Sequence, residues 1–172
     1  MTEAEFLTLP ETQERVELID GEVVVAPSPS FWHQDVLLRL AVVLRQWSAA
    51  ASAPFEVCLA PLDVRFGPDR ILQPDLFVLQ GHLPRAHTGP IERVPIVCVE
   101  VLSSNRSYDR ITKRFIYAQA GVAEYWIVSA AEVIERWTGD GLEHVEEVHD
   151  RLTTPVLPQL VLDVPSLFAT PP

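Results

Sequence analysis

The feature that most constrains this chain is a nearly continuous apolar run at residues 96–102, in which Glu100 is the charged exception. A short apolar run without alternating polar positions is typical of a central strand that is covered on both faces. A helix is predicted to follow at about residues 107–120, because candidate N-caps precede it and Gly121 supplies a C-cap. More strand-like residues come after Gly121, so the sequence predicts a strand–helix–strand crossover within one sheet.

The N-terminal part is expected to form a short helix and then a β-hairpin. Thr2 starts a capping-box pattern, so a short helix should follow it and stop near Pro10. Residues 16–27 contain two apolar runs on either side of Asp20-Gly21, which is a strong signal for a type I′ turn.

The other expected elements are a long helix, several strands and a polar loop. The helix covers about residues 31–51, where apolar residues recur at helical spacing. Strands are predicted at residues 55–66, 71–79, 124–128, 133–137 and 142–148, with a short edge strand at 160–164. A polar loop is predicted at residues 81–95. No repeat or linker divides the chain, so we expect a single domain, residues 1–172. We expect the α/β class, with helices and strands in a mixed (α+β) order along the chain. The strands should form a mixed sheet that is flanked by helices.

Composition narrows the class of protein. A chain of 172 residues with 48% hydrophobic content is long and apolar enough to bury a core. No apolar run approaches the roughly 18 residues of a membrane span. The acidic N-terminus is unlike the basic start of a secretory signal, so a cytoplasmic location without a membrane partner is expected. Cys58 and Cys98 lie in apolar runs and are predicted to be reduced core residues.

The charge of the chain counts against general nucleic-acid binding. The formal net charge is −11, whereas nucleic-acid binders carry excess Lys and Arg to replace phosphate counterions. A nucleic-acid partner would therefore depend on a local basic patch. Of the 13 Lys and Arg residues, only Lys113 is a lysine. A single lysine in an arginine-using chain suggests a role that needs an ammonium group.

Glu100 and Asp75 are the first two candidate site residues. A carboxylate inside an apolar strand costs several kcal/mol unless it is paired or binds a cation. One interpretation of Glu100 is an ion pair with an arginine, and the other is a metal ligand or general base. Asp75 follows Pro74 on the strand predicted at 71–79, and neighbouring strands lie about 4.8 Å apart. Two such carboxylates could share one Mg²⁺ or Mn²⁺ ion, which prefers oxygen ligands.

Lys113 is the third candidate. Residues 109, 113 and 117 lie one turn apart on the predicted helix, so Asp109, Lys113 and Tyr117 share a face. The crossover places the start of this helix beside the end of the strand that carries Glu100. An ammonium group there could stabilise negative charge on a phosphate or orient the attacking water. The alternative is a surface lysine paired with Asp109.

The pattern that these residues form resembles the Uma-two (Uma2) family, a bacterial family of the PD-(D/E)XK nuclease superfamily. The resemblance covers roughly residues 15–140. It rests on Pro74-Asp75, on Glu100-Val101-Leu102-Ser103, on Asp109 and Lys113, on the run 117–126, on residues 17–22 and on Trp32-His33-Gln34.

The resemblance implies a restriction-endonuclease-like core in which Asp75 and Glu100 bind Mg²⁺ or Mn²⁺. It also implies that the backbone carbonyl of Val101 is a further metal ligand. In the standard superfamily motif a lysine stands two residues after the acid, and here that position is Leu102. Lys113 resembles the migrated lysine seen in such families.

Glu17 and His33 are further catalytic candidates. In one interpretation, Glu17 is an additional acid that binds the metal or acts as a base. In the other, it is a hairpin residue that faces solvent. His33, on the first turn of the long helix, either faces the site and contacts substrate or is a helix-start histidine with a backbone partner. Tyr117 and Trp126 are expected in the core. The remaining histidines lack metal-ligand spacing and are expected in solvent, at positions His82, His87, His144 and His149.

Three functions remain open from the sequence. The first is a Mg²⁺-dependent endonuclease that hydrolyses phosphodiester bonds, with DNA as the preferred substrate. The second is a non-catalytic dimeric interaction module that keeps the nuclease fold, and the third is a hydrolase of a small phosphodiester. A homodimer is expected from strand edges that could pair. A basic groove near Asp75 would favour nucleic acid, built from Arg65, Arg70, Arg106, Arg110 and Arg114.

Overall fold

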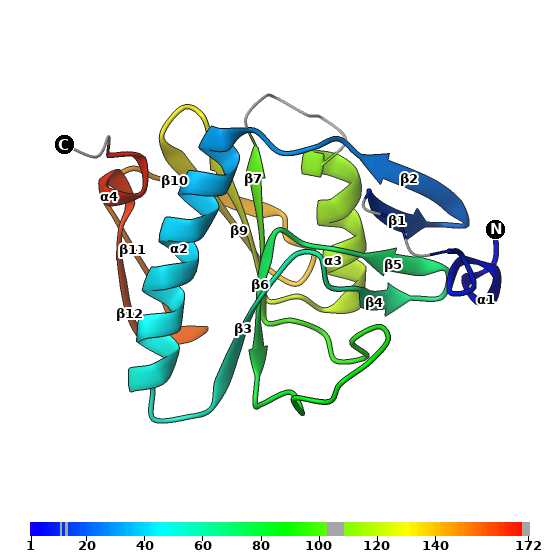
Figure 1. Cartoon of the computed structure of the whole chain (residues 1–172). Helices are drawn as coiled ribbons and strands as arrows, with labels where there is room; N and C mark the ends of the chain where they lie inside the picture. The colour runs from blue at the N-terminus through cyan, green and yellow to red at the C-terminus, as the bar shows by residue number, and fades with distance from the viewer. Residues whose placement is uncertain (11, 13, 103–108, 170–172) are drawn as a thin grey trace.

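The computed structural model describes residues 1–10, 12, 14–102 and 109–169, and a six-stranded mixed sheet forms its centre (Figure 1). The order of strands in this sheet is β10-β9-β8-β7-β6-β3. Strands β7 and β8 are parallel, and the other neighbours are antiparallel. The strands are β3 (Phe55–Leu59), β6 (Leu76–Gln80), β7 (Val97–Leu102), β8 (Glu124–Ser129), β9 (Val133–Thr138) and β10 (His144–Val148). The predicted crossover and the mixed α/β class are confirmed.

Two smaller sheets and the helices surround the central sheet. A four-stranded sheet has the order β2-β1-β5-β4, and a two-stranded sheet pairs β11 with β12. Their strands are β1 (Arg15–Ile19), β2 (Glu22–Ala26), β4 (Val64–Gly67), β5 (Arg70–Leu72), β11 (Arg151–Thr154) and β12 (Leu157–Asp163). The helices are α1 (Glu3–Phe6), α2 (Phe31–Ala50), the π-helix η1 (Asp109–Lys113), α3 (Arg114–Ala120) and α4 (Val164–Phe168).

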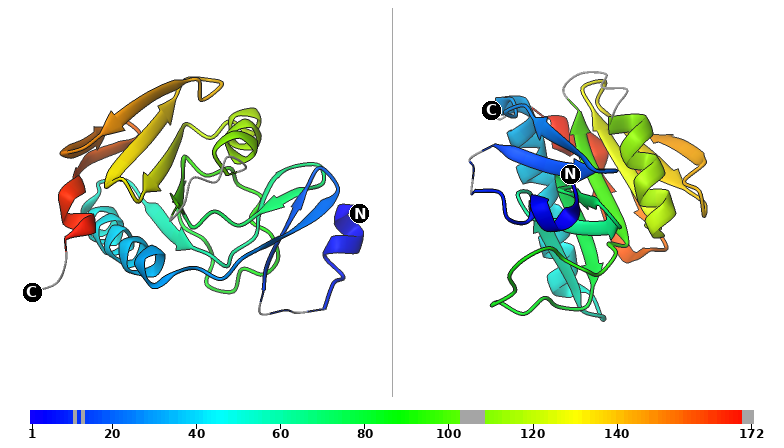
Figure 2. Two further views of the ribbon diagram at one scale, coloured as in Figure 1. Left: turned by 90° about the horizontal axis from the view of Figure 1, so that it is seen from above. Right: turned by 90° about the vertical axis from the view of Figure 1, so that its right-hand side faces the viewer.

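The central sheet is covered on both faces, as the apolar run at residues 96–102 predicts. Helix α2 and the β11–β12 sheet lie on one side, and α3 and the four-stranded sheet lie on the other (Figures 1 and 2). Successive side chains of β7 alternate between the two faces. Val99 and Val101 face α2, whereas Cys98 and Leu102 face α3. Glu100 shares the face of Cys98 and Leu102.

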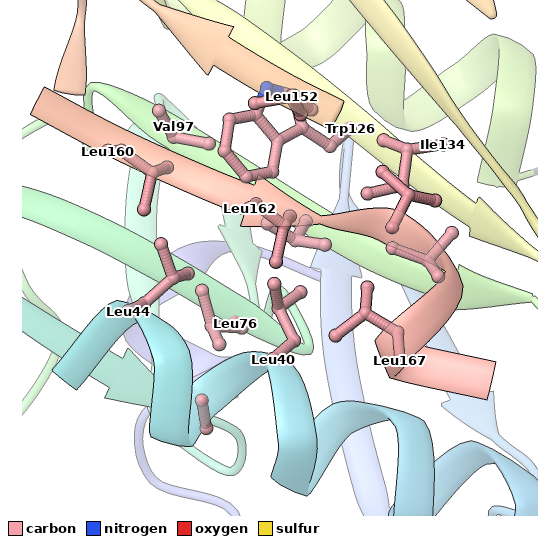
Figure 3. Packing of buried hydrophobic residues seen from close by; sticks show 14 of the residues in the cluster. Leu40, Leu44, Leu76, Val97, Trp126, Ile134, Leu152, Leu160, Leu162 and Leu167 are labelled. Atoms are coloured by element: carbon pink, nitrogen blue, oxygen red, sulfur yellow. The ribbon is translucent and has the colours of Figure 1, made fainter. Parts of the chain in front are cut away.

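The larger core lies between α2, the central sheet and the C-terminal elements. Leucines of α2 pack against β6 and β12, and Trp126 of β8 lies under the same layer (Figure 3). Each buried leucine contributes about 1.5–3 kcal/mol relative to an exposed one. This layer holds β7 and the N-terminal end of α2 in fixed positions, which matters because both carry site residues.

The predicted helix start and hairpin near the N-terminus are confirmed. Thr2 forms the expected capping box at α1. The β1–β2 turn uses Asp20 and Gly21 at positive φ of 50° and 83°, the conformation of a type I′ turn. Glu17 pairs with Val24, as that two-residue turn requires.

Two predicted strands are wrong in their extent. The stretch 55–66 forms β3 and β4, and the stretch 71–79 forms β5 and β6, with the members of each pair in different sheets. Pro61 and Pro74 lie in the two connections, where a residue without an N–H cannot continue a ladder. The chain therefore passes from the four-stranded sheet to the central sheet at Pro74, and Asp75 stands at this passage, immediately before β6.

The helix predicted at residues 107–120 is only partly regular. Its described part is the π-helix η1 followed by α3, and Gly121 ends it at a φ of 86°. Short π-helical turns occur often at functional sites. Residues 103–108 and the side chain of Asp109 lie outside the described structure, so the expected Asp109–Lys113 pair is not tested. None of the described helices is both long and apolar enough to cross a membrane.

A buried polar network fixes the two-stranded sheet to the central one. Glu124 of β8 accepts hydrogen bonds from Trp126 Nε1 at 2.9 Å and from Arg136 Nε at 3.0 Å. It also accepts one from Thr154 of β11. Residues 160–163 of the predicted edge strand lie in β12, which pairs with β11 rather than with the central sheet, and Val164 begins α4.

Candidate functional site

The structure brings five predicted side chains together beside the C-terminal half of β7. Glu17 comes from β1, His33 from α2, Asp75 from the segment before β6, Glu100 from β7 and Lys113 from η1. Direct contacts join His33 to Asp75, and Lys113 to Glu17 and Glu100. Ion pairs with Arg15 link these two groups. Glu17, Asp75, Glu100 and Lys113 are each only 3% exposed, so this is a buried site and not a surface cluster. The solvent-facing interpretation of Glu17 and the surface interpretation of Lys113 are wrong.

Glu100 is held by two donors from the crossover helix. Its Oε1 accepts hydrogen bonds from Lys113 Nζ at 3.0 Å and from Tyr117 Oη at 2.9 Å. Burial raises the pKa of Glu100 to about 8, although Lys113 and Arg15 lower it. Tyr117 is a core residue, as expected, but its hydroxyl also belongs to the site.

Asp75 is held as an ionised carboxylate. Its Oδ2 accepts a hydrogen bond from the backbone N–H of Val101 at 2.8 Å and lies 3.0 Å from His33 Nε2. Ser30 caps α2 through the His33 amide and so fixes His33 on the first turn. Burial raises the pKa of Asp75, but the hydrogen bond with His33 and the charge of Arg15 lower it by more. The pKa of Asp75 therefore lies well below its usual range.

Lys113 lies between two glutamates. Its Nζ donates hydrogen bonds of 3.0 Å to Oε1 of Glu17 and to Oε1 of Glu100. Burial lowers the pKa of Lys113, but the charges of Glu100 and Glu17 raise it by more than burial lowers it. The pKa therefore lies above its ordinary value, and the ammonium stays charged. Glu17 Oε1 also accepts a hydrogen bond of 2.8 Å from the backbone N–H of Gln73.

Arg15 belongs to the site as well, and the sequence analysis did not identify it. Its Nη1 donates to Oδ1 of Asp75, and its Nη2 lies 3.7 Å from Glu17 Oε1 and 3.9 Å from Glu100 Oε2. Arg15 and Glu17 stand two residues apart on β1, so period-two alternation places both on one face. The two-residue spacing between Arg15 and Glu17 is the sequence signal that could have identified Arg15 as a site residue.

The carboxylates of the site offer the oxygen ligands that a hard divalent cation prefers. Asp75 and Glu100 each keep one oxygen, Oδ1 and Oε2, that faces Arg15 and not the rest of the fold. Across the described residues, no three His, Cys, Asp or Glu side chains are arranged to hold a metal ion together. The acids are thus present, but they are arranged around Arg15. Val101 lies at the site through its amide, and its carbonyl remains a predicted ligand.

The arginines proposed for a basic groove are occupied by other partners. Arg65 pairs with Glu3 and Glu92, Arg70 with Asp20, and Arg110 with Glu135. Arg114 lies 4.2 Å over the ring of Trp137, and Arg106 is outside the described residues. The described part of this set therefore offers little unpaired positive charge.

The predictions for the two cysteines, for Trp126 and for the four remaining histidines are confirmed. Cys58 and Cys98 are buried free cysteines. Trp126 is fully buried in the core. His82, His144 and His149 have side chains that are between 65% and 75% exposed, and the side chain of His87 contacts a backbone carbonyl.

Comparisons with known proteins agree with the fold. The model of the Uma2 family, described as "Putative restriction endonuclease", matches residues 3–165. A solved structure described as "a putative nuclease belonging to DUF820" from Anabaena variabilis superposes with a TM-score of 0.79. It is 23% identical in sequence, and the match covers 98% of this chain and 97% of that one. A comparison with curated proteins found no match. The chain therefore belongs to the Uma2 family and has a restriction-endonuclease-like fold.

Proposed function

We propose that this protein is a divalent-metal-dependent endonuclease that hydrolyses phosphodiester bonds, with DNA as the first substrate to test. The observation that carries the proposal is the pair of buried acids, Asp75 and Glu100, beside a buried and charged Lys113. Membership of a family described as restriction endonucleases supports it. Enzymes with this type of fold generally use divalent metal ions.

Asp75 and Glu100 would hold Mg²⁺ or Mn²⁺ through Oδ1 and Oε2, with Glu17 and the Val101 carbonyl as further candidates. When bound, such an ion polarises a phosphoryl oxygen and lowers the pKa of a coordinated water. The Val101 N–H fixes the rotamer of Asp75, and Lys113 and Tyr117 fix that of Glu100. Both acids are thus oriented before substrate arrives, which reduces reorganisation during reaction.

Lys113 would stabilise negative charge on the scissile phosphate or orient the attacking water. The position of the usual motif lysine is taken by Leu102, which is buried in the apolar cluster between β7 and α3. Lys113, by contrast, reaches Glu100 from the helix. This supports Lys113 as the functional replacement. His33, beside Asp75, would contact the substrate.

A second candidate function is hydrolysis of a small phosphodiester. The arginines near the site are paired with acids, and the net charge is −11, so long polyanions would be repelled over most of the surface. A small substrate would need only the site itself. The non-catalytic interaction module remains the third candidate. The homodimer and the cytoplasmic location remain predictions from the sequence.

Cleavage assays with Mg²⁺ or Mn²⁺ test the proposal. Plasmid DNA, short DNA and RNA oligonucleotides, and bis(p-nitrophenyl) phosphate should be compared for wild type, Asp75→Asn and Lys113→Ala. The exposed Arg45→Gln serves as the control, since its side chain is 59% exposed. Loss of cleavage in the two site variants, with activity kept in the control, would support a nuclease. Cleavage that survives both substitutions would refute the assignment, and cleavage of the small ester alone would favour the second candidate.

A further inference from the structure

Arg15 contacts every carboxylate of the acidic site. Its guanidinium faces three carboxylates, those of Glu17, Asp75 and Glu100. One of the three contacts is a direct hydrogen bond, to Asp75. The other two N–O separations, 3.7 and 3.9 Å, are ion-pair distances that exceed a normal hydrogen bond. The guanidinium thus stands where a cation would be shared by these acids.

The carboxylate oxygens that face Arg15 differ from those that the rest of the fold holds. The fold engages Asp75 through Oδ2 and Glu100 through Oε1. The opposite oxygens, Oδ1 and Oε2, approach Arg15, and the described residues supply them with no other hydrogen-bond donor. A cation that replaced the guanidinium would therefore find two available oxygens without breaking the contacts that orient either acid.

Arg15 itself is incompletely satisfied in this position. Its Nε and Nη2 atoms are buried, and neither has a hydrogen-bond partner among the described residues. A buried donor without a partner carries a desolvation cost. The Arg15 side chain is nevertheless 22% exposed, whereas that of Lys113 is 4% exposed. Arg15 therefore lies at the solvent side of the site and can leave it without crossing the core.

The charges match an exchange of one cation for another. Once Glu100 has lost its proton, as metal binding requires, the three carboxylates and the Lys113 ammonium leave two negative charges. The Arg15 guanidinium balances one of them, and a divalent cation would balance both. Lys113 has two hydrogen-bonded glutamate partners and stays within the network in either case.

We infer that Arg15 is the built-in counter-ion of this acidic site, and that a divalent cation binds by displacing its guanidinium from Asp75 and Glu100. The inference rests on the proposed metal-dependent function and adds a residue that sets how readily the metal enters. The guanidinium that leaves is suited to pair with a phosphate, because its planar fork matches phosphate oxygens. The rival role is a permanent structural partner that orients Asp75.

Calorimetric titration with Mn²⁺ separates the two roles. Wild type, Arg15→Gln and the surface control Arg45→Gln are compared in the same buffer. Removal of the competing cation should tighten Mn²⁺ binding by about tenfold or more in Arg15→Gln, since a charge-assisted contact no longer has to be broken. The control should bind like wild type. Equal or weaker binding by Arg15→Gln, with normal binding by wild type, overturns the inference and leaves the proposed function intact. Absence of Mn²⁺ binding in all three proteins overturns both.

A second measurement does not depend on the stability of the variant. In protein labelled with ¹⁵N-arginine, the Arg15 Nε–H signal is identified by its loss in Arg15→Gln, or in Arg15→Lys if the first variant fails to fold. Hydrogen exchange at Arg15 Nε is then measured in wild type with and without Mg²⁺. Displacement into solvent predicts exchange at least about tenfold faster when Mg²⁺ is bound. An unchanged signal and exchange rate with Mg²⁺ bound would show that Arg15 stays in place, contrary to the inference.

Discussion

Lys113 Nζ lies 3.0 Å from Oε1 of Glu100, although Leu102 holds the sequence position that a motif lysine would take. The crossover from β7 to β8 makes this contact, because it returns η1 and α3 over the face of β7 that carries Glu100. The site therefore depends on the parallel pair at the centre of the sheet.

Loss of the buried ammonium should destabilise the protein. Lys113→Met leaves the Glu17 carboxylate without its cation and Glu100 without a hydrogen-bond donor, and breaking a buried ion pair costs about 3–5 kcal/mol. Urea unfolding at pH 7.5 measures the free energy of unfolding. Arg45→Met removes an exposed pair with Glu56 and should cost less than about 1 kcal/mol. Similar losses in both variants would contradict a buried, charge-dependent role for Lys113.

Removal of one carboxylate charge should weaken metal binding more than it alters the fold. Asp75→Asn keeps the shape of the side chain but removes the charge at Oδ1, so Mn²⁺ affinity should fall by at least about tenfold. Calorimetry reports the affinity, and circular dichroism reports the fold. Mn²⁺ binding equal to that of wild type would exclude Asp75 as a ligand.

The affinity for metal should depend on pH because Glu100 must lose its proton to bind. Burial raises the pKa of Glu100 from its ordinary 4.5 to about 8, so the metal-free site holds this proton at neutral pH. Mn²⁺ affinity should therefore rise between pH 6 and pH 8, by up to about tenfold per pH unit, and protons should be released on binding. Titrations at pH 6, 7 and 8 in two buffers of different ionisation enthalpy measure both quantities. A flat profile without proton release would show that Glu100 is already ionised or is not a ligand.

The same proton affects stability in the opposite direction. Between pH 4.5 and pH 8 the folded state binds the Glu100 proton more tightly than the unfolded state, so this group favours folding less as pH rises. The stabilisation from Glu100 is complete below pH 4.5 and is lost through pH 8. Glu100→Gln should remove this contribution, and comparison of its unfolding profile with that of wild type in EDTA measures it.

The second buried network makes a prediction that concerns only the fold. Glu124→Gln weakens charge-assisted hydrogen bonds from Arg136 and should cost about 2–3 kcal/mol. Glu146 pairs with the same arginine at 3.2 Å, but its side chain is 65% exposed. Glu146→Gln should therefore leave the unfolding temperature nearly unchanged. Equal effects of the two substitutions would contradict the importance of burial.

Local signals in the sequence predicted much of this structure. The Asp20-Gly21 turn predicts the register of β1 and β2, and the charge inside an apolar strand identifies Glu100. Gly121 predicts the end of α3, and the single lysine directs attention to Lys113. In each case the constraint is local backbone geometry or the cost of burying a charge, so a few neighbouring residues suffice.

The rest depends on contacts between distant segments. The division of residues 71–79 into β5 and β6 follows from which sheet each half joins, and Pro74 alone does not specify that. The first turns of the crossover helix are π-helical, a choice that helical spacing does not reveal. Arg15 has a strand-like position, but its partners Asp75 and Glu100 are brought to it by the packing of two sheets.

Crystals soaked with Mn²⁺ give the most direct test, because anomalous scattering locates the ion without reference to activity. We expect an anomalous peak in contact with Oδ1 of Asp75 and Oε2 of Glu100, with the Arg15 guanidinium moved out of the site. No peak between these carboxylates at a saturating Mn²⁺ concentration, with Arg15 still bound to Asp75, would contradict this expectation.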